Sequence, residues 1–214
     1  MEQQREIAER TSQYLLQIKA VKLNVKDPFT WTSGIQSPIY CDNRITLSFP
    51  LIRTFIRQSF VNLIIEEFGT IDFIAGVATG AIAMGALVAQ EMDLPFAYVR
   101  SAKKGHGLEN LIEGRTQPGQ SVVVVEDLIS TGKSSLAAVK ALRDAGCNVK
   151  GMAAIFTYGL KKAELNFGNE KCRLVTLTDY ETLIKKALEE DYIYKKDMVA
   201  LQNWKVSPET WNNV

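Results

Sequence analysis

Two adjacent acids and the turn that follows them are the residues of this chain best suited to chemistry. Glu126 and Asp127 come directly after four valines, and Ser130–Ser134 has the sequence Ser-Thr-Gly-Lys-Ser. Backbone N–H groups and hydroxyls at the start of a helix bind a phosphate well, aided by the helix dipole. The two carboxylates would repel that phosphate and suit neutral hydroxyls, such as those of a ribose. The segment therefore predicts a site for a phosphorylated sugar.

Two other interpretations of this segment are alternatives to the sugar phosphate site. Gly132-Lys133-Ser134 resembles the end of an ATP-binding P-loop, but that motif needs a glycine where Asp127 stands. A strand end followed by an N-cap at Ser130 or Thr131 is the second alternative, and it explains the hydroxyls. It does not explain two adjacent acids after a buried strand.

A second segment, Arg100–Gly107, carries cations and glycines. The glycines Gly105 and Gly107 predict a loop that moves and that lets a ligand approach closely. Cations placed beside a departing diphosphate would lower the barrier to its release. The alternative is a solvated basic surface loop. The candidate side chains are Arg100, Lys103, Lys104 and the only histidine of the chain, His106.

The elements around these segments alternate between strands and helices. We expect strands at Phe73–Val77, Phe96–Val99, Val122–Val125, Val149–Phe156 and Arg173–Leu177, with helices at Ile82–Gln90, Ser134–Ala145 and Lys161–Phe167. Continuous apolar strands separated by helices predict an α/β fold with a parallel sheet that is covered on both faces. Ligands bind beyond the carboxyl ends of such strands, so the loops after Val77, Val99 and Val125 should hold the site.

The ends of the chain have simpler patterns. The first twenty residues predict an amphipathic helix, with Ile7, Tyr14, Leu15, Ile18 and Val21 near one face. Residues 29–40 predict short strands and turns, and a second helix is expected from Pro50 to near Gly69. The tail from Asp179, with Trp204 and Trp211, suggests helical packing or part of a subunit contact.

The composition describes a globular chain without a bulk charge. Its 214 residues are 46% apolar, and 25 basic against 24 acidic side chains give a formal charge of +1. This balance gives no support to nucleic-acid or membrane-surface binding. Three cysteines far apart, Cys41, Cys147 and Cys172, suggest neither disulfides nor zinc, and the N-terminus lacks a signal-peptide pattern, so we expect a cytoplasmic protein.

One uncharged run, residues 73–90, is long enough to suggest a transmembrane helix. Its glycines divide an Ile/Phe/Val pattern from an Ala-rich pattern. We therefore favour a buried strand, a turn and a helix over a membrane span.

The segment from Val122 to Ser135 resembles the sequence motif of the type I phosphoribosyltransferases, which bind phosphoribosyl pyrophosphate (PRPP). The resemblance implies their fold, a mostly parallel sheet flanked by helices with a small N-terminal hood. It divides a single domain into residues 1–48 (helix and hood), 49–178 (α/β core) and 179–214 (helical tail). It also implies that Glu126 and Asp127 hold the ribose hydroxyls, and that the 5'-phosphate is wrapped by Leu128, Ile129, Ser130, Thr131, Gly132, Lys133 and Ser134.

Two further segments resemble the orotate phosphoribosyltransferases within that family. Arg100, Lys104 and His106 match their catalytic loop, and residues 29–44 match the segment that forms a hood over the base. The resemblance implies transfer of phosphoribose from Mg²⁺-bound PRPP to orotate, with Lys104, His106 and Asp127 as catalytic residues and Ser130 touching both substrates. It implies no direct protein ligand to the metal, and a homodimer whose loop closes over the neighbouring subunit's site.

The chain departs from the enterobacterial form of that enzyme at positions near the base. Thr32 stands where that form has a lysine, Thr79-Gly80 where it has Tyr-Lys, and Tyr158 where it has an arginine. We expect the orotate carboxylate to be met by Arg44, whose planar guanidinium suits it, or by backbone N–H groups around Ser33 and Gly34.

Two other functions were compared with this one. A PRPP-sensing regulator would keep the phosphate site, but it would need neither the Arg-Lys-His loop nor the hood, and a nucleic-acid binder should show a basic face. A transferase for another base would keep the loop and change residues 29–44.

Overall fold

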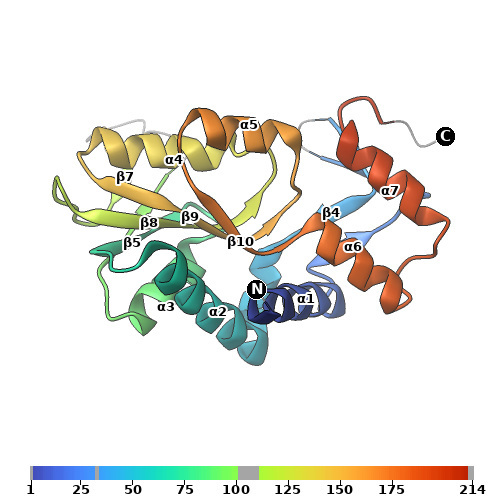
Figure 1. The fold of residues 1–214 in the computed structure, drawn as a ribbon, viewed down its shortest axis with the longest axis horizontal. Helices are drawn as coiled ribbons and strands as arrows, with labels where there is room; N and C mark the ends of the chain where they lie inside the picture. Colours follow the sequence, from blue (N-terminus) through green and yellow to red (C-terminus); the bar gives the residue numbers. More distant parts are fainter. Residues whose placement is uncertain (1, 32–33, 101–110, 212–214) are drawn as a thin grey trace.

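The structure is a computed structural model that describes residues 2–31, 34–100 and 111–211. Its centre is a six-stranded sheet in the order β10-β9-β8-β5-β6-β7 (Figure 1). Neighbouring strands are parallel, except that β7 runs antiparallel to β6. The strands are β5 (Phe73–Val77), β6 (Phe96–Val99), β7 (Ile112–Glu113), β8 (Ser121–Ile129), β9 (Asn148–Thr157) and β10 (Leu174–Asp179).

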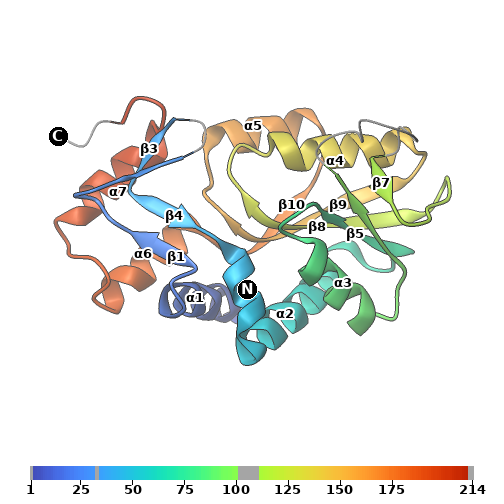
Figure 2. The same ribbon diagram turned by 180° about the vertical axis from the view of Figure 1, so that it is seen from behind.

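Helices cover both faces of this sheet (Figures 1 and 2). Val123 and Val125 of β8 pack on the side of α1, α2 and α3, whereas Val122 and Val124 pack on the side of α4 and α5. Because alternate side chains enter two separate cores, every position of the valine run is apolar. The helices are α1 (Glu2–Gln17), α2 (Pro50–Phe68), α3 (Ile82–Glu91), α4 (Lys133–Asp144) and α5 (Lys161–Asn169). The predicted α/β fold is confirmed.

A smaller unit of short strands and C-terminal helices stands at one end of the sheet (Figure 2). Strand β1 (Val21–Leu23) pairs with β4 (Ile39–Cys41), and β2 (Phe29–Thr30) pairs with β3 (Gln36–Ser37). The hood, residues 29–44, comprises β2, β3, β4 and the start of the 3-10 helix η1 (Asn43–Ser48). The tail forms α6 (Tyr180–Glu189) and α7 (Asp197–Val206).

One predicted boundary that matters for the site was wrong. The valine strand does not end at Val125, because β8 continues beside β9 with Leu128 opposite Phe156 and Ile129 opposite Thr157. Glu126 and Asp127 therefore lie within the strand, and the turn begins at Ser130. The first helix is also shorter than expected. It ends at Gln17, and Val21 belongs to β1.

The uncharged run at residues 73–90 forms strand β5, a turn and most of α3, as the glycine pattern predicted. In the described parts of the chain, no helix combines the length and apolar character needed to cross a membrane. Cys41, Cys147 and Cys172 are buried free cysteines.

Candidate active site

The carboxyl ends of the neighbouring strands β5, β6 and β8 lie together at one edge of the sheet, where the parallel strands predicted a site. Strand β5 lies between the other two, and the Ala78 N–H donates to the Val99 carbonyl at 2.8 Å. The loop after β5, residues 78–81, contains a cis peptide bond between Ala78 and Thr79. A Cβ atom on Gly80 would overlap the Asp127 carboxyl group. The glycine therefore lets this loop lie directly against the acid.

The Glu126 carboxylate is buried and engaged by its own surroundings. It accepts a hydrogen bond from Ser135 Oγ at 2.8 Å and another from the Asp127 N–H at 3.0 Å. Ser135 is in the first turn of α4, so Glu126 joins strand β8 to the helix that follows the phosphate loop. Burial raises the pKa of Glu126 well above its usual range, and the negative charge of Asp127 adds to this shift.

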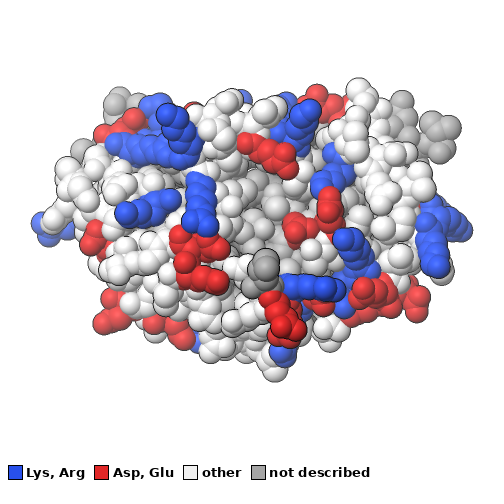
Figure 3. Space-filling view, viewed as in Figure 1, with Lys and Arg blue, Asp and Glu red and all other residues white. Residues whose placement is uncertain are grey.

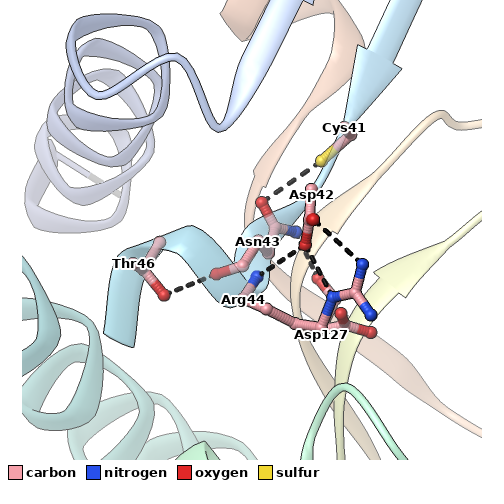
Figure 4. Close-up of polar contacts among 6 residues, drawn as sticks. All are labelled: Cys41, Asp42, Asn43, Arg44, Thr46 and Asp127. Atoms are coloured by element: carbon pink, nitrogen blue, oxygen red, sulfur yellow. Dashed lines mark hydrogen bonds and ion pairs between the residues drawn. The ribbon is translucent and has the colours of Figure 1, made fainter. Parts of the chain in front are cut away.

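Asp127 is less buried than Glu126 and lies beside the start of η1 (Figure 4). Its backbone carbonyl accepts a hydrogen bond from Asn43 Nδ2 at 2.5 Å. Burial raises the pKa of Asp127, while the nearby Arg44 guanidinium opposes that rise. Arg44 itself holds Asp42 through two contacts, Nε to Oδ1 at 2.7 Å and Nη2 to Oδ2 at 2.9 Å.

The turn after β8 has the form expected of a phosphate cradle, by which we mean residues 130–134. Gly132 adopts φ +75°, and a Cβ atom there would collide with the Phe167 ring. Asn166 Nδ2 donates to the Thr131 carbonyl at 2.8 Å, so α5 fixes the shape of the turn. Helix α4 begins at Lys133, and the first N–H groups of a helix have no carbonyl partner within it. These N–H groups and the flanking hydroxyls form an anion-binding arrangement.

The predicted phosphate residues differ in their exposure. Lys133 and Ser134 are exposed on the first turn of α4, and Gly132 is buried at the turn. Ile129 is fully buried in the core and its carbonyl accepts from the Tyr158 N–H at 3.1 Å, so its side chain is kept away from the site.

A cavity of about 690 Å³ joins the cradle to the hood. We call it the hood cavity. Leu128, Ser130 and Thr131 line its side toward the sheet, and Trp31 and Tyr158 supply aromatic surface. The described residues that complete its lining are Thr30, Ile35, Tyr40, Cys41, Lys162 and Glu209. The arrangement can hold a flat polar ring beside a phosphorylated sugar.

The C-terminal tail supports this cavity, a role that the sequence did not reveal. Trp204 of α7 is fully buried, with its ring centroid 5.5 Å from that of Trp31 and 5.6 Å from that of Tyr158. Its Nε1 donates to the Gln36 carbonyl in β3 at 3.1 Å. A buried tryptophan needs a hydrogen-bond partner for its N–H, so the sequence could have indicated that Trp204 has one. It could not identify the partner, because Gln36 is distant in the sequence.

The remaining predicted residues fall into two groups. Arg100 follows β6, is half-buried and lies 3.5 Å from Glu113 Oε1, and its N–H donates to the Leu111 carbonyl at 2.9 Å. The Gly34 N–H donates to the Trp31 carbonyl at 2.8 Å within the β2–β3 turn. Four predicted residues lie outside the described ranges: Ser33, Lys103, Lys104 and His106.

Comparisons with known proteins agree with one another. Residues 52–182 match the family model of the phosphoribosyl transferase domain. The chain is 57% identical over 198 residues to an orotate phosphoribosyltransferase of Bacteroides thetaiotaomicron, covering 92% of this chain and 93% of the relative. It is 53% identical over 205 residues to that of Listeria innocua, covering 96% and 98%.

Solved structures of similar fold include an orotate phosphoribosyltransferase and a UMP synthase. The orotate phosphoribosyltransferase from Aeropyrum pernix has a TM-score of 0.73 and 28% identity, covering 82% of this chain and 96% of that chain. The UMP synthase of Leishmania donovani has a TM-score of 0.78 and 22% identity, covering 92% of this chain and 42% of that chain. The latter likeness concerns the fold alone.

Proposed function

The chain belongs to the orotate phosphoribosyltransferase family, and we propose that its reaction takes place where the hood cavity meets the phosphate cradle. It transfers the phosphoribosyl group of PRPP to orotate, giving orotidine 5'-monophosphate and pyrophosphate in the synthesis of UMP. One observation carries the assignment of the site: Ser130 and Thr131 of the cradle line the same cavity as the aromatic side chains of Trp31 and Tyr158. A phosphoribosyl group and a base would then lie side by side.

The ribose phosphate is assigned to β8 and to the turn after it. Asp127 accepts hydrogen bonds from ribose hydroxyls, because its carboxylate is only partly buried and the side-chain-free Gly80 lies against it. Glu126 is bound to Ser135 and the Asp127 N–H, so it takes a hydroxyl with its remaining lone pairs or orients Asp127. The cradle and the first N–H groups of α4 bind the 5'-phosphate.

The base lies on the hood side of the cavity, where Trp31 and Tyr158 can contact its faces. A ring nitrogen of orotate attacks the ribose C1 as the bond to pyrophosphate breaks, through a state with oxocarbenium character. Ser130 lies where the two substrates meet. Closing the cavity against water protects this state from hydrolysis.

Pyrophosphate gains negative charge as it leaves, and the loop after β6 carries the cations that stabilise it. Arg100 begins this loop, and its neighbours Lys103, Lys104 and His106 supply charge and a proton donor. The junction of Arg100 with Leu111 supports this role, because it fixes where both ends of the loop attach to the sheet.

The site fits Mg²⁺ brought in with PRPP. Glu126 is buried and its neighbour Asp127 is half-buried, and both acids have raised pKa values, an arrangement that a cation would stabilise. The metal would be held chiefly by oxygens of PRPP, with Asp127 or Glu126 reaching it through the ribose hydroxyls. When bound, Mg²⁺ neutralises charge on the diphosphate.

Three further assignments concern the location in the cell, the assembly and the domain organisation, and the homodimer rests on the resemblance to the family. We propose a cytoplasmic homodimer in which the segment 101–110 of one subunit closes over the site of its partner. The chain is one domain, in which the tail supports the hood through Trp204 and Gln36. On the face seen in Figure 3, Lys and Arg side chains are interspersed with Asp and Glu, which favours a small-molecule enzyme over a nucleic-acid binder.

The experiment that tests the function mixes the protein with Mg²⁺, PRPP and one of orotate, uracil, adenine or hypoxanthine, and measures pyrophosphate release. We expect release with orotate; release with a purine alone contradicts the base assignment, and no release with any base favours a regulator. Lys104→Ala should lower kcat at least about 100-fold with little loss of stability. Lys150→Ala, which changes an exposed lysine on β9, is the matched control. Equal loss of activity and stability in Lys104→Ala would contradict its catalytic role.

A further inference from the structure

The substrate orotate carries a carboxylate, yet the cations expected near the base are absent from this sequence. Thr32, Gly80 and Tyr158 stand at the positions where the sequence departs from the enterobacterial pattern. A carboxylate bound in a largely apolar cavity needs a cation or several N–H donors, because losing its hydration is costly. Other groups of the cavity must therefore supply a cation or N–H donors for this carboxylate.

Two of the residues first predicted for this role, Arg44 and Gly34, already have partners in the structure. The Nε and Nη2 atoms of Arg44 hold Asp42, and Arg44 is not among the described residues that line the hood cavity. The Gly34 N–H is used within the hairpin by the Trp31 carbonyl. A substrate carboxylate would have to break these contacts to bind at Nε and Nη2 of Arg44 or at the Gly34 N–H.

Lys162 is the one lysine or arginine among the described residues that line the hood cavity. It is the second residue of α5, which begins just after Tyr158 and Gly159. A cation is unfavourable at a helix N-terminus, since the helix dipole places positive charge there. The lysine and the dipole together make this wall of the cavity attractive to an anion.

The Lys162 ammonium already has an anionic partner from the tail. Its Nζ lies 2.9 Å from Glu209 Oε1, and Glu209 is the one acid among the described residues of the lining. The side chains of Lys162 and Glu209 are 61% and 64% exposed. Exposed pairs of this kind contribute little to stability, so a second carboxylate can displace the first at small cost.

We propose that Lys162 binds the carboxylate of orotate, and that Glu209 is the counter-ion which the substrate displaces. In the free protein Glu209 holds the ammonium at the edge of the cavity. When orotate binds, its carboxylate replaces that of Glu209 as the partner of the Lys162 ammonium, while Trp31 and Tyr158 contact the orotate ring. This inference rests on the proposed site, and it makes Lys162 a specificity residue that separates orotate from uncharged pyrimidines such as uracil.

Steady-state kinetics with each substrate varied test this inference. Lys162→Met should raise the KM for orotate at least about 10-fold, and leave the KM for PRPP within about twofold, because it removes a charge that only orotate meets. Lys162→Arg keeps the positive charge, so its KM for orotate should stay closer to that of the unaltered protein than the KM of Lys162→Met does. Glu209→Gln should lower the KM for orotate by about two- to fivefold, since it removes the competing carboxylate.

Lys161→Met is the matched control, because Lys161 is the preceding lysine of the same helix turn and lines a different cavity with Glu164 and Glu181. It should leave both KM values unchanged. An unchanged orotate KM in Lys162→Met, an equal rise for both substrates, or the same effect in Lys161→Met overturns the inference, and a raised orotate KM in Glu209→Gln overturns the exchange. Failure of the proposed function itself is distinct: the unaltered protein would then release no pyrophosphate with orotate.

Discussion

The side-chain amide of Asn43 donates a hydrogen bond to the backbone carbonyl of Asp127, with 2.5 Å between Nδ2 and the oxygen (Figure 4). Asn43 is 1% exposed, and its Oδ1 accepts from Cys41 Sγ at 3.2 Å. The link joins the end of the hood to the strand that carries the acidic pair. The position of Asp127 therefore depends on a residue that is remote in sequence.

Replacing Asn43 should impair both the fold and the site. Asn43→Ala leaves the partly buried Asp127 carbonyl without this donor, so we expect a loss of about 1–3 kcal/mol in the free energy of unfolding. The freed strand end should also lower kcat/KM for PRPP by about 10-fold, as a displaced substrate-binding group does. Urea unfolding and initial rates measure the two effects. Asn24→Ala is the control, because Asn24 caps only the exposed Asp27 N–H; a destabilised Asn43→Ala with full kcat/KM would show that Asp127 keeps its place.

Gly80 should tolerate no side chain without loss of activity. The Cβ atom of Gly80→Ala would overlap the Asp127 carboxyl group, which must rotate away from the loop after β5. We expect kcat/KM for PRPP to fall at least about 10-fold, with a stability cost of about 1–2 kcal/mol. The matched change is Gly168→Ala in α5, where a Cβ atom meets nothing within 4 Å. That variant should be about 0.5–1 kcal/mol more stable and fully active; equal activity in the two variants would contradict the role of Gly80.

Most of the sheet could be predicted because its central strands are buried on both faces. The valine run and the Phe73–Val77 segment contain no polar side chain, so both could be predicted as buried strands from the sequence alone. Strand β8 was predicted to end too early, because Glu126 and Asp127 resemble the start of a loop. Only the partner β9, which continues to Thr157, keeps them in the sheet.

The parts of the site that escaped prediction depend on contacts between distant segments. Strands β1, β4 and β7 are too short to show a periodicity, and they exist because a neighbouring strand pairs with them. Local turn chemistry predicted a turn before a helix near residues 130–134, and the structure has a turn there with α4 beginning at Lys133. It gave no sign that Trp204 in the tail packs on Trp31, or that Glu209 pairs with Lys162.

Glu126 should make stability depend on pH in the direction opposite to that of a salt-bridged acid. Its folded-state pKa is raised by burial and by Asp127, so the folded protein holds this proton more tightly than the unfolded chain does. The free energy of unfolding therefore falls as the pH rises above 4.5, the ordinary pKa of a glutamate. It stops falling once the pH exceeds the folded-state pKa of Glu126.

The variant Glu126→Gln cannot ionise at this position, so it avoids the loss of stability that the Glu126 charge causes. At neutral pH it should unfold about 2–4 °C higher than the unaltered protein, corresponding to about 1 kcal/mol. The difference should shrink as the pH falls toward 4, because Glu126 then becomes mostly protonated in the unfolded chain as well as in the folded protein. Thermal melts between pH 4 and pH 8 measure it, and kcat/KM for PRPP should fall because the carboxylate is lost. A gap between the two melting curves that is the same at every pH would contradict the raised pKa.

Trp204 should control the base side of the cavity more than the phosphate side. Trp204→Phe keeps an aromatic ring against Trp31 and Tyr158 but removes the N–H that holds the Gln36 carbonyl. Losing that hydrogen bond should cost about 0.5–1.5 kcal/mol in the free energy of unfolding.

The looser hood should raise the KM for orotate by about fivefold and leave the KM for PRPP unchanged, since the cradle is fixed separately by Asn166 and Phe167. Varying each substrate in turn measures the two constants. Trp211→Phe changes another buried tryptophan of the tail, one that is not among the described residues lining the hood cavity, and it should affect neither constant. If Trp204→Phe raised both KM values in parallel, the tail would be acting on the whole site, and the hood would not be a separate unit that positions the base.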